Sequence, residues 1–324
     1  MSRLLVTGGY GFIGSNFVNY WLRNNPEDYV VNLDKMTYAA DENYVEASLK
    51  KKNYSFVRGD IADRELVMSV TNEVDTVINF AAESHVDNAI NEPSTFLRSN
   101  YWGVFNLLEA SRKRDLRFHQ ISTDEVYGSL SLDSNDKFDD NSRYNPKNPY
   151  SATKAAADML VRAYFNTYGV RATISNCSNN FGPHQHPEKL IPKTILNAKL
   201  NRKIPLYGDG RQIRDWIFVD DHVRGIEVIL KRGKVGESYL ISTDNQRRNI
   251  EVVSEILRLL KKDKNLIEFV SDRPGHDVRY ALDSSKLKSI GWSPLNDFEN
   301  SLDLTVKHYL KEFESYSKKD AVKR

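Results

Sequence analysis

Two residues in the middle of the chain have side chains and a spacing suited to moving a proton. Tyr150 and Lys154 are four residues apart in a segment that opens after Asn148 and Pro149, so a helix there places both side chains on one face. A lysine ammonium near a phenol favours the phenolate, which makes Tyr150 a candidate base for a hydroxyl group. The sequence holds 17 tyrosines, enough for one such pair to arise by chance, so the interpretation depends on where the pair lies.

An adjacent pair of carboxylates, Asp124 and Glu125, follows directly after an expected strand at 118–122. Burying both charges is costly unless each has a partner or a task. Thr123, just before the pair, carries a hydroxyl that can hydrogen-bond a substrate oxygen. Loop capping is the alternative for an isolated Asp-Glu pair. Because this pair occurs together with Tyr150 and a glycine turn, the combination favours chemistry.

The glycine turn consists of Gly8, Gly11 and Gly14, after the first expected strand. This spacing allows a tight turn, close approach of a pyrophosphate to the backbone, and phosphate binding at a helix N-terminus. Asp34 ends the second expected strand, where a carboxylate accepts both hydroxyls of an adenosine ribose and repels a 2′-phosphate. The pattern predicts a dinucleotide site that favours NAD over NADP, although Lys35 tempers that preference. A structural turn with a surface aspartate is the alternative.

These residues need a scaffold that brings strand ends together. Apolar, strand-like runs alternate with helical periodicity through the first half of the chain, which predicts a parallel sheet with helices on both faces. Such a sheet binds ligands outside the carboxyl ends of its strands. After Cys177, shorter segments between polar loops indicate a smaller mixed lobe. The expected strands are 3–6, 29–33, 54–57, 76–82 and 118–122, and the expected helices include 12–23 and 95–113.

Composition narrows the class of protein. The 46 basic and 44 acidic residues nearly cancel, which argues against binding to nucleic acid or a membrane surface. The N-terminal segment lacks the apolar core of a signal peptide, so a cytoplasmic enzyme is expected. A single cysteine, Cys177, excludes an intramolecular disulfide. No cysteine or carboxylate cluster accompanies His184 and His186, so we expect a structural loop there and no metal site.

The motifs resemble a known family. The turn Gly8–Gly14 with Tyr150 and Lys154 resembles the extended short-chain dehydrogenase/reductase family. The resemblance implies an α/β fold with a Rossmann-type doubly wound parallel sheet and a smaller mixed α/β C-terminal substrate domain. It covers Arg3 to about Tyr309. Narrower motifs resemble the family's dTDP-glucose 4,6-dehydratases, namely Thr123–Glu125, Ser178–Pro183, Pro187–Pro192, Gly208–Gly210, Ile213–Trp216 and Arg273–Asp277.

The resemblance also implies a reaction and a role for each catalytic group. Tyr150 takes the proton of the glucose 4-hydroxyl while NAD takes the C4 hydride. Glu125 then removes the C5 proton, and Asp124 protonates the departing 6-hydroxyl, so that water is lost. The hydride returns to C6, and the product is dTDP-4-keto-6-deoxyglucose for deoxysugar biosynthesis. Asp124 needs a raised pKa for this role, which burial beside Glu125 would supply.

Binding residues are implied motif by motif. The best physical support is for Lys189 and Arg214, because a substrate pyrophosphate needs cations. The implied NAD contacts are Gly8, Gly11, Phe12, Ile13, Gly14, Asp34, Lys35, Thr37, Asp60, Ile61, Ala81, Ala82, Asn100, Tyr150, Lys154 and Asn180. The implied substrate contacts are Ser84, Thr123, Asn179, Lys189, Leu190, Pro205, Tyr207, Arg214, Asn249, Arg273 and His276.

We expect residues 1–176, with a return segment at 213–243, to form the NAD-binding domain. Residues 177–212 and 244–315 are then the nucleotide-sugar domain, and 316–324 a charged tail. Apolar helices at 95–112 and 155–168 suit either a homodimer interface or burial within the monomer. Two other functions stay open at this point. One is another NAD-dependent nucleotide-sugar enzyme, a 4-epimerase or decarboxylase, and the other is a non-catalytic NAD-sensing protein.

Overall fold

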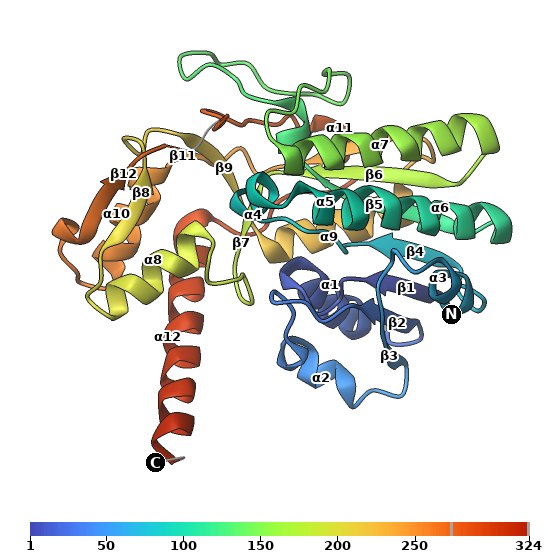
Figure 1. The fold of residues 1–324 in the computed structure, drawn as a ribbon, viewed down its shortest axis with the longest axis horizontal. Helices are drawn as coiled ribbons and strands as arrows, with labels where there is room; N and C mark the ends of the chain where they lie inside the picture. The colour runs from blue at the N-terminus through green and yellow to red at the C-terminus, as the bar shows by residue number, and fades with distance from the viewer. Residues whose placement is uncertain (273–274, 323–324) are drawn as a thin grey trace.

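A computed structural model describes residues 1–272 and 275–322 of the chain. Its centre is a seven-stranded, fully parallel sheet in the order β10-β6-β5-β4-β1-β2-β3 (Figure 1). This parallel, doubly wound sheet confirms the predicted fold class. The strands are β1 (Arg3–Thr7), β2 (Tyr29–Asp34), β3 (Tyr54–Arg58), β4 (Thr76–Asn79), β5 (Arg117–Thr123), β6 (Ala172–Cys177) and β10 (Ser238–Ile241).

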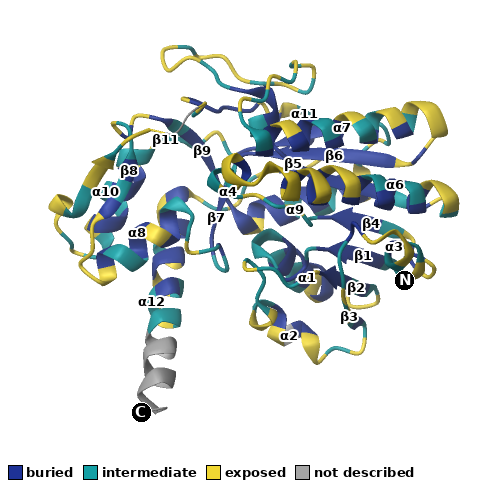
Figure 2. Cartoon of the chain, viewed as in Figure 1, coloured by how far each residue is buried: buried dark blue, intermediate teal, exposed yellow. Residues whose placement is uncertain are grey.

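Helices cover both faces of this sheet because its strands are apolar on both sides. Figure 2 shows the strands buried and the outward sides of the helices exposed. One core packs α1 (Phe12–Asn24), α9 (Val219–Arg232) and α11 (Ser285–Ser289) against the sheet. A second core packs α3 (Arg64–Val70), α6 (Gly103–Arg114) and α7 (Pro149–Tyr168) on the other face.

Two expected segments differ from the structure. The expected strand 76–82 ends at Asn79, the last residue that pairs with either neighbouring strand, β1 or β5. The expected helix 95–113 is divided into α5 (Pro93–Phe96), a π-helical turn η2 (Leu97–Trp102) and α6. Between β4 and α5 lies α4 (Val86–Asn91), and before β3 lie the 3-10 turn η1 (Glu42–Val45) and α2 (Glu46–Leu49).

The second lobe faces the carboxyl ends of the sheet strands, on the side away from the N-terminus (Figure 1). Its three-stranded sheet has the order β11-β9-β7, and a two-stranded sheet pairs β12 with β8. The predicted charged tail begins inside α12, which continues to Val322. The elements are β7 (Asn179–Phe181), α8 (Leu190–Lys199), β8 (Ile204–Tyr207), β9 (Ile213–Phe218), β11 (Gln246–Arg248), α10 (Asn249–Leu259), η4 (Lys264–Leu266), β12 (Ile267–Val270) and α12 (Phe298–Val322).

Strand order reverses between β1 and β4, and ligands of such sheets bind where the order reverses. The glycine turn follows β1, and Ala81 follows β4, so both lie at this point. Within the described residues, none of the helices is long and apolar enough to cross a membrane.

Candidate active site

The glycine turn brings the backbone of two strand ends into close contact. Gly8 has φ +70°, and a Cβ atom there would lie 2.7 Å from the backbone nitrogen of Ala81. A Cβ atom on Gly14 would lie 2.2 Å from the carbonyl oxygen of Gly8. Only glycine avoids both clashes. The turn therefore leaves open backbone at the N-terminus of α1, the position where phosphate binds in such folds.

Asp34 forms the far end of this site. Its two carboxylate oxygens accept backbone hydrogen bonds from Tyr10 (2.9 Å) and Met36 (2.8 Å). Burial raises the pKa of Asp34, and these two bonds lower it. Each oxygen keeps a second lone pair for a ligand donor. A fixed, buried carboxylate of this kind suits the two hydroxyls of a ribose.

Lys35 does not stand free beside Asp34. Its ammonium pairs with Asp60 at 3.0 Å, and Arg98 approaches the same carboxylate at 3.5 Å. The pair lines a cavity of about 110 Å³ at the carboxyl ends of the first strands. Of the predicted cofactor contacts, this cavity is lined by Gly8, Gly11, Asp34, Lys35, Thr37, Asp60, Ile61, Ala81 and Ala82.

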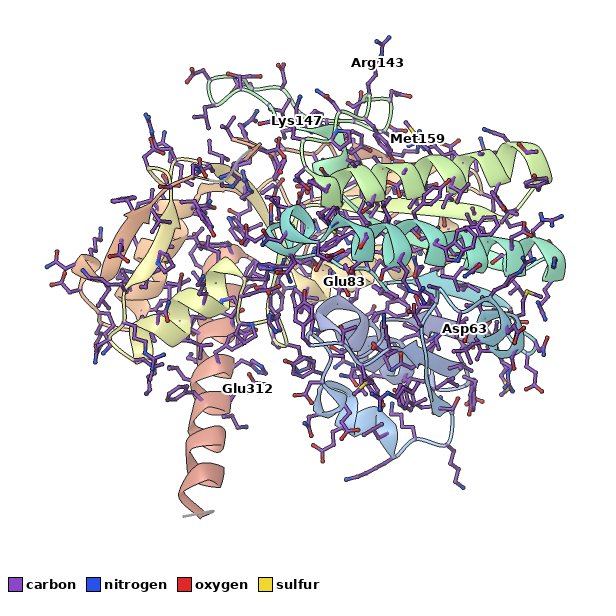
Figure 3. All side chains as sticks on the ribbon, in the orientation of Figure 1. Asp63, Glu83, Arg143, Lys147, Met159 and Glu312 are labelled. Atoms are coloured by element: carbon purple, nitrogen blue, oxygen red, sulfur yellow. The ribbon has the colours of Figure 1, made fainter. Side chains whose placement is uncertain are left out.

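Asn100 lies behind the loop that closes this cavity. Its amide oxygen accepts from the backbone nitrogen of Glu83 (2.9 Å), and its nitrogen donates to the carbonyl of Glu83 (3.0 Å) and to Thr153 Oγ1 (3.0 Å). Glu83 lies at the centre of the view in Figure 3. Asn100 thus holds the loop after β4 in place. Together with the open glycine turn and Asp34, this arrangement fits a dinucleotide with a free 2′-hydroxyl.

The carboxylate pair lies on the 3-10 turn η3 (Asp124–Tyr127), directly after β5. Asp124 is 2% exposed, Thr123 Oγ1 donates to its Oδ1 (3.1 Å), and its Oδ2 has no hydrogen-bond partner among the described residues. Burial first, and then the charge of Glu125, raise the pKa of Asp124 well above its ordinary value. This direction of the pKa shift favours the protonated form of Asp124.

Glu125 has a different environment from its neighbour. Burial raises its pKa, but a hydrogen bond from Asn148 Nδ2 (3.3 Å) to Oε2 and the cations Lys189 and Arg214 lower it. The pKa is raised well above its ordinary value at Asp124, and at Glu125 it is raised against three partners that lower it, a difference that favours Asp124 as the acid and Glu125 as the base. Two adjacent carboxyl groups with separated pKa values are suited to one acid and one base.

Tyr150 and Lys154 lie on the first turns of α7, which begins at a capping box formed by Asn148 and Ser151. Lys154 Nζ donates to the carbonyl oxygen of Ile121 (2.7 Å). The pKa of Tyr150 is raised well above its ordinary value, mainly by burial and next by the charge of Glu125. This direction of the pKa shift is opposite to the predicted shift toward the phenolate, because burial dominates and the charges of Glu125 and Asp124 act in the same sense.

A larger cavity of about 290 Å³ lies between the two lobes and continues toward the catalytic pair. Glu125, Asn179 and Lys189 line both this cavity and a neighbouring one of about 280 Å³ that reaches Tyr150 and Lys154. The neighbouring cavity is also lined by Phe12, Ile13, Gly14, Thr123, Asp124 and Asn180. The larger one is lined by the predicted substrate contacts Ser84, Asn179, Lys189, Leu190, Pro205, Tyr207, Arg214, Asn249 and His276, whereas Arg273 lies outside the described residues.

Arg214 is held rigidly in this cavity. Its guanidinium donates to the carbonyls of Ile213 (2.9 Å) and Asp277 (2.8 Å) and lies 4.4 Å from the centre of the Tyr280 ring. It also contacts His276 Nε2 at 3.1 Å. Because a guanidinium only donates, His276 Nε2 is the acceptor, and its Nδ1 carries a hydrogen. The cavity therefore presents a fixed cation to an anionic ligand.

Several residues of the site carry no signal in the sequence. Tyr280 is buried, lines the larger cavity and donates to Asp277 Oδ2 at 2.6 Å. Trp216 also lines it. From the sequence alone, an aromatic residue of this kind is interpreted as part of the hydrophobic core, so neither was predicted as a site residue. Asn148 was visible as the residue before Pro149, but only the structure shows its bond to Glu125.

Two weaker sequence signals have structural explanations. His184 stacks on Tyr44 with ring centres 4.3 Å apart. Within the described residues, no group of three or more histidine, cysteine or carboxylate side chains is arranged to hold a metal ion. Burial raises the pKa of Cys177 to about 12, so its thiol is neutral and a poor nucleophile.

The doubly wound sheet, the glycine turn and the Tyr150–Lys154 pair define a nucleotide-binding enzyme of the short-chain dehydrogenase/reductase type. The family described as GDP-mannose 4,6 dehydratase matches residues 5–305, and the chain belongs to that family. The chain is 51% identical over 312 residues to the dTDP-glucose 4,6-dehydratase of Mycobacterium tuberculosis, an alignment that covers 95% of this chain and 93% of the relative.

Solved structures give the same result. A dTDP-glucose 4,6-dehydratase from Bacillus anthracis, in complex with NAD, has a TM-score of 0.91 at 43% identity and covers 97% of this chain and 98% of its own. A dTDP-glucose 4,6-dehydratase from Streptomyces venezuelae with NAD bound has a TM-score of 0.92 at 41% identity, covering 95% of this chain and 97% of its own.

Proposed function

We propose that this protein is an NAD-dependent dehydratase that converts dTDP-glucose to dTDP-4-keto-6-deoxyglucose in deoxysugar biosynthesis. The observation that carries the proposal is the pair of buried Asp124 and half-buried Glu125, which line one cavity together with Tyr150 and have different surroundings. A dehydration across C5 and C6 needs one acid and one base on neighbouring atoms. Simple oxidation at C4 needs only a base for the hydroxyl proton, the role given to Tyr150, and no further acid and base.

NAD, when bound, supplies the hydride acceptor for C4 and returns the same hydride to C6. Tyr150 takes the proton of the 4-hydroxyl, for which it must first be a phenolate. Burial and the charge of Glu125 oppose the phenolate form of Tyr150. A positive charge near the phenol favours the phenolate. The ammonium of Lys154 is held by the carbonyl oxygen of Ile121 within the same cavity and contributes one such positive charge.

Glu125 and Asp124 carry out the loss of water. A ketone at C4 acidifies the C5 proton, and Glu125 Oε accepts it. Asp124 donates its proton to the departing 6-hydroxyl through Oδ2, the oxygen without a hydrogen-bond partner in the described part of the chain. Glu125 then returns its proton to C5 as hydride reaches C6. Asp124 ends the cycle ionised and Tyr150 protonated, so one proton moves back to Asp124 before the next turnover.

The substrate's diphosphate is placed by Arg214 and Lys189, the two cations predicted for it. Lys189 Nζ donates to the carbonyl of Ser84 at 3.0 Å, which fixes the ammonium at the junction of the two cavities. Pro205 and Tyr207 on β8 also line the larger cavity and frame the base. With the base and the diphosphate bound at these residues, the sugar of the substrate would point toward Glu125.

A single incubation tests the proposal. The enzyme with NAD and dTDP-glucose should give a product lighter by one water, identified by mass spectrometry. Recovery of dTDP-galactose would support the 4-epimerase alternative, and loss of carbon dioxide from an acidic sugar would support the decarboxylase. Tight NAD binding without turnover of any dTDP-, UDP-, CDP- or GDP-sugar would support a non-catalytic sensor. Comparing turnover of these four classes of nucleotide sugar shows which nucleotide base the enzyme prefers.

We also propose that the enzyme is a homodimer. Trp102 on η2 is 51% exposed and Met159 on α7 is 59% exposed, together with Leu97 and Tyr101. Met159, labelled in Figure 3, extends from α7. Exposed apolar side chains that gather on packed elements such as η2 and α7 are typical of protein interfaces. Analytical ultracentrifugation should give twice the monomer mass, and a monomer mass would contradict the proposal. The division into domains at 176/177 and the cytoplasmic location stay predictions.

A further inference from the structure

Trp216 is a part of the larger cavity that the mechanism above leaves unused. Its side chain is 4% exposed and lines this cavity, and its indole Nε1 has no hydrogen-bond partner among the described residues. Two other buried indoles differ, since Trp21 donates to Asp28 (3.2 Å) and Trp292 to the carbonyl of Asp221 (3.0 Å). A buried donor without an acceptor costs free energy, so the acceptor for Trp216 is expected in a ligand.

The strand register shows which part of a ligand that acceptor belongs to. Arg214 and Trp216 are two residues apart on β9, so their side chains leave the same face of the strand. On the neighbouring strand β7, Asn179 pairs in register with Trp216, and its buried Oδ1 also lacks a hydrogen-bond partner within residues 1–272 and 275–322. The indole therefore lies beside Arg214 along β9 and beside Asn179 across the strand pair, and all three residues line the larger cavity.

We propose that the Trp216 indole N–H donates a hydrogen bond to the diphosphate of the substrate. This inference rests on the proposed function and adds a binding residue to it. A phosphate oxygen is the acceptor that best matches a neutral donor beside Arg214, because the cation draws the anion to that face and a bond to an ion is stronger than one to a hydroxyl. Pro205 and Tyr207, which frame the nucleotide base, lie on β8 in the two-stranded sheet, whereas Arg214 and Trp216 lie on β9 in the three-stranded sheet.

The test is the Trp216→Phe variant, which removes the N–H and keeps an aromatic ring. Its Kd for dTDP, measured by calorimetry on the full chain, should rise about tenfold, the size expected for a hydrogen bond to a charged group. Its Kd for thymidine, which has no phosphate, should stay the same. KM for dTDP-glucose should rise more than kcat falls. Trp21→Phe is the matched control, because it removes a buried indole N–H far from the cavity and should leave both Kd values unchanged.

Each outcome has one reading. If the wild-type protein does not bind dTDP, the proposed function fails. If the wild type binds and Trp216→Phe binds dTDP equally well, or loses affinity for thymidine by the same factor, the assignment of the indole to the diphosphate is wrong. If the variant does not fold, the ¹⁵N-labelled wild type decides. The chain has 4 tryptophans, and the Trp216 signal is the one kept in Phe variants of the other three. A downfield shift of that N–H proton with dTDP supports the proposal, and no shift overturns it.

Discussion

Replacing Glu125 with glutamine separates the two halves of the proposed reaction. The amide is nearly the same size as the carboxylate and keeps an oxygen that can accept from Asn148 Nδ2, now 3.3 Å from Oε2. What it loses is the ability to take the C5 proton. The charge of Glu125 is also the largest cause after burial of the raised pKa of Tyr150, and the same holds for Asp124. The variant therefore lowers both of those pKa values.

The expected magnitudes differ between the two steps. Loss of a general base costs about 10²–10⁴-fold in the step that it serves, so dehydration and C5 proton exchange should fall by that factor. Oxidation at C4 depends on Tyr150, whose lowered pKa favours the phenolate. Its rate should be kept, and the pH at which it reaches half its maximum should move to lower pH.

The assay is single turnover with dTDP-glucose in deuterated water. Absorbance of the reduced nicotinamide reports the first step, and incorporation of deuterium at C5 reports the second. Glu255→Gln is the control, since Glu255 pairs with Arg258 at the surface of α10 and should leave both signals unchanged. If Glu125→Gln keeps C5 exchange at the wild-type rate, another group is the base and the reasoning fails.

Three further predictions follow from the same contacts. Asp124→Asn should stop the loss of water and raise the Tm at neutral pH. The folded pKa of Asp124 lies well above its unfolded value, so folding loses stability as pH rises from about 4 toward the raised value, and asparagine removes that loss. Equal Tm values for the wild type and Asp124→Asn across that pH range would contradict a raised pKa of Asp124. Arg214→Lys loses bonds to Ile213 and Asp277 and should raise KM for dTDP-glucose about 10–100-fold, whereas an unchanged KM would exclude a phosphate contact. Gly8→Ala places a Cβ atom 2.7 Å from the nitrogen of Ala81 and should lower the free energy of unfolding by at least about 1–2 kcal/mol and weaken NAD binding, both measurable by calorimetry. An alanine variant with native stability and NAD affinity would contradict the role of the turn.

The sequence was most informative where local geometry dictates a residue type. Gly8 and Gly14 were predicted because a turn that leaves no room for Cβ atoms must be glycine, and the structure shows both close approaches. The alternation of strands and helices predicted the parallel sheet for a similar reason, since buried strands are apolar on both faces. Strand 76–82 was too long because its pairing with both neighbouring strands ends at Asn79, which is a property of the pairing.

Long-range electrostatics and side-chain partners could not be predicted. Spacing placed Lys154 one turn from Tyr150, but the pKa of the phenol depends on Glu125, which is 25 positions away in the chain and comes close only through the fold. Lys35 likewise meets Asp60 only because β2 and β3 are neighbours. Trp216 and Tyr280 were indistinguishable from core aromatics until the cavity between the lobes was visible.

The central claim is that one site oxidises C4, removes water and returns the same hydride to C6. Incubation with dTDP-glucose that carries deuterium at C4 tests it directly. The account predicts a product lighter by one water, with the deuterium on C6 of the same molecule. Deuterium that returns to C4, or a product without loss of water, would contradict the account and indicate an epimerase.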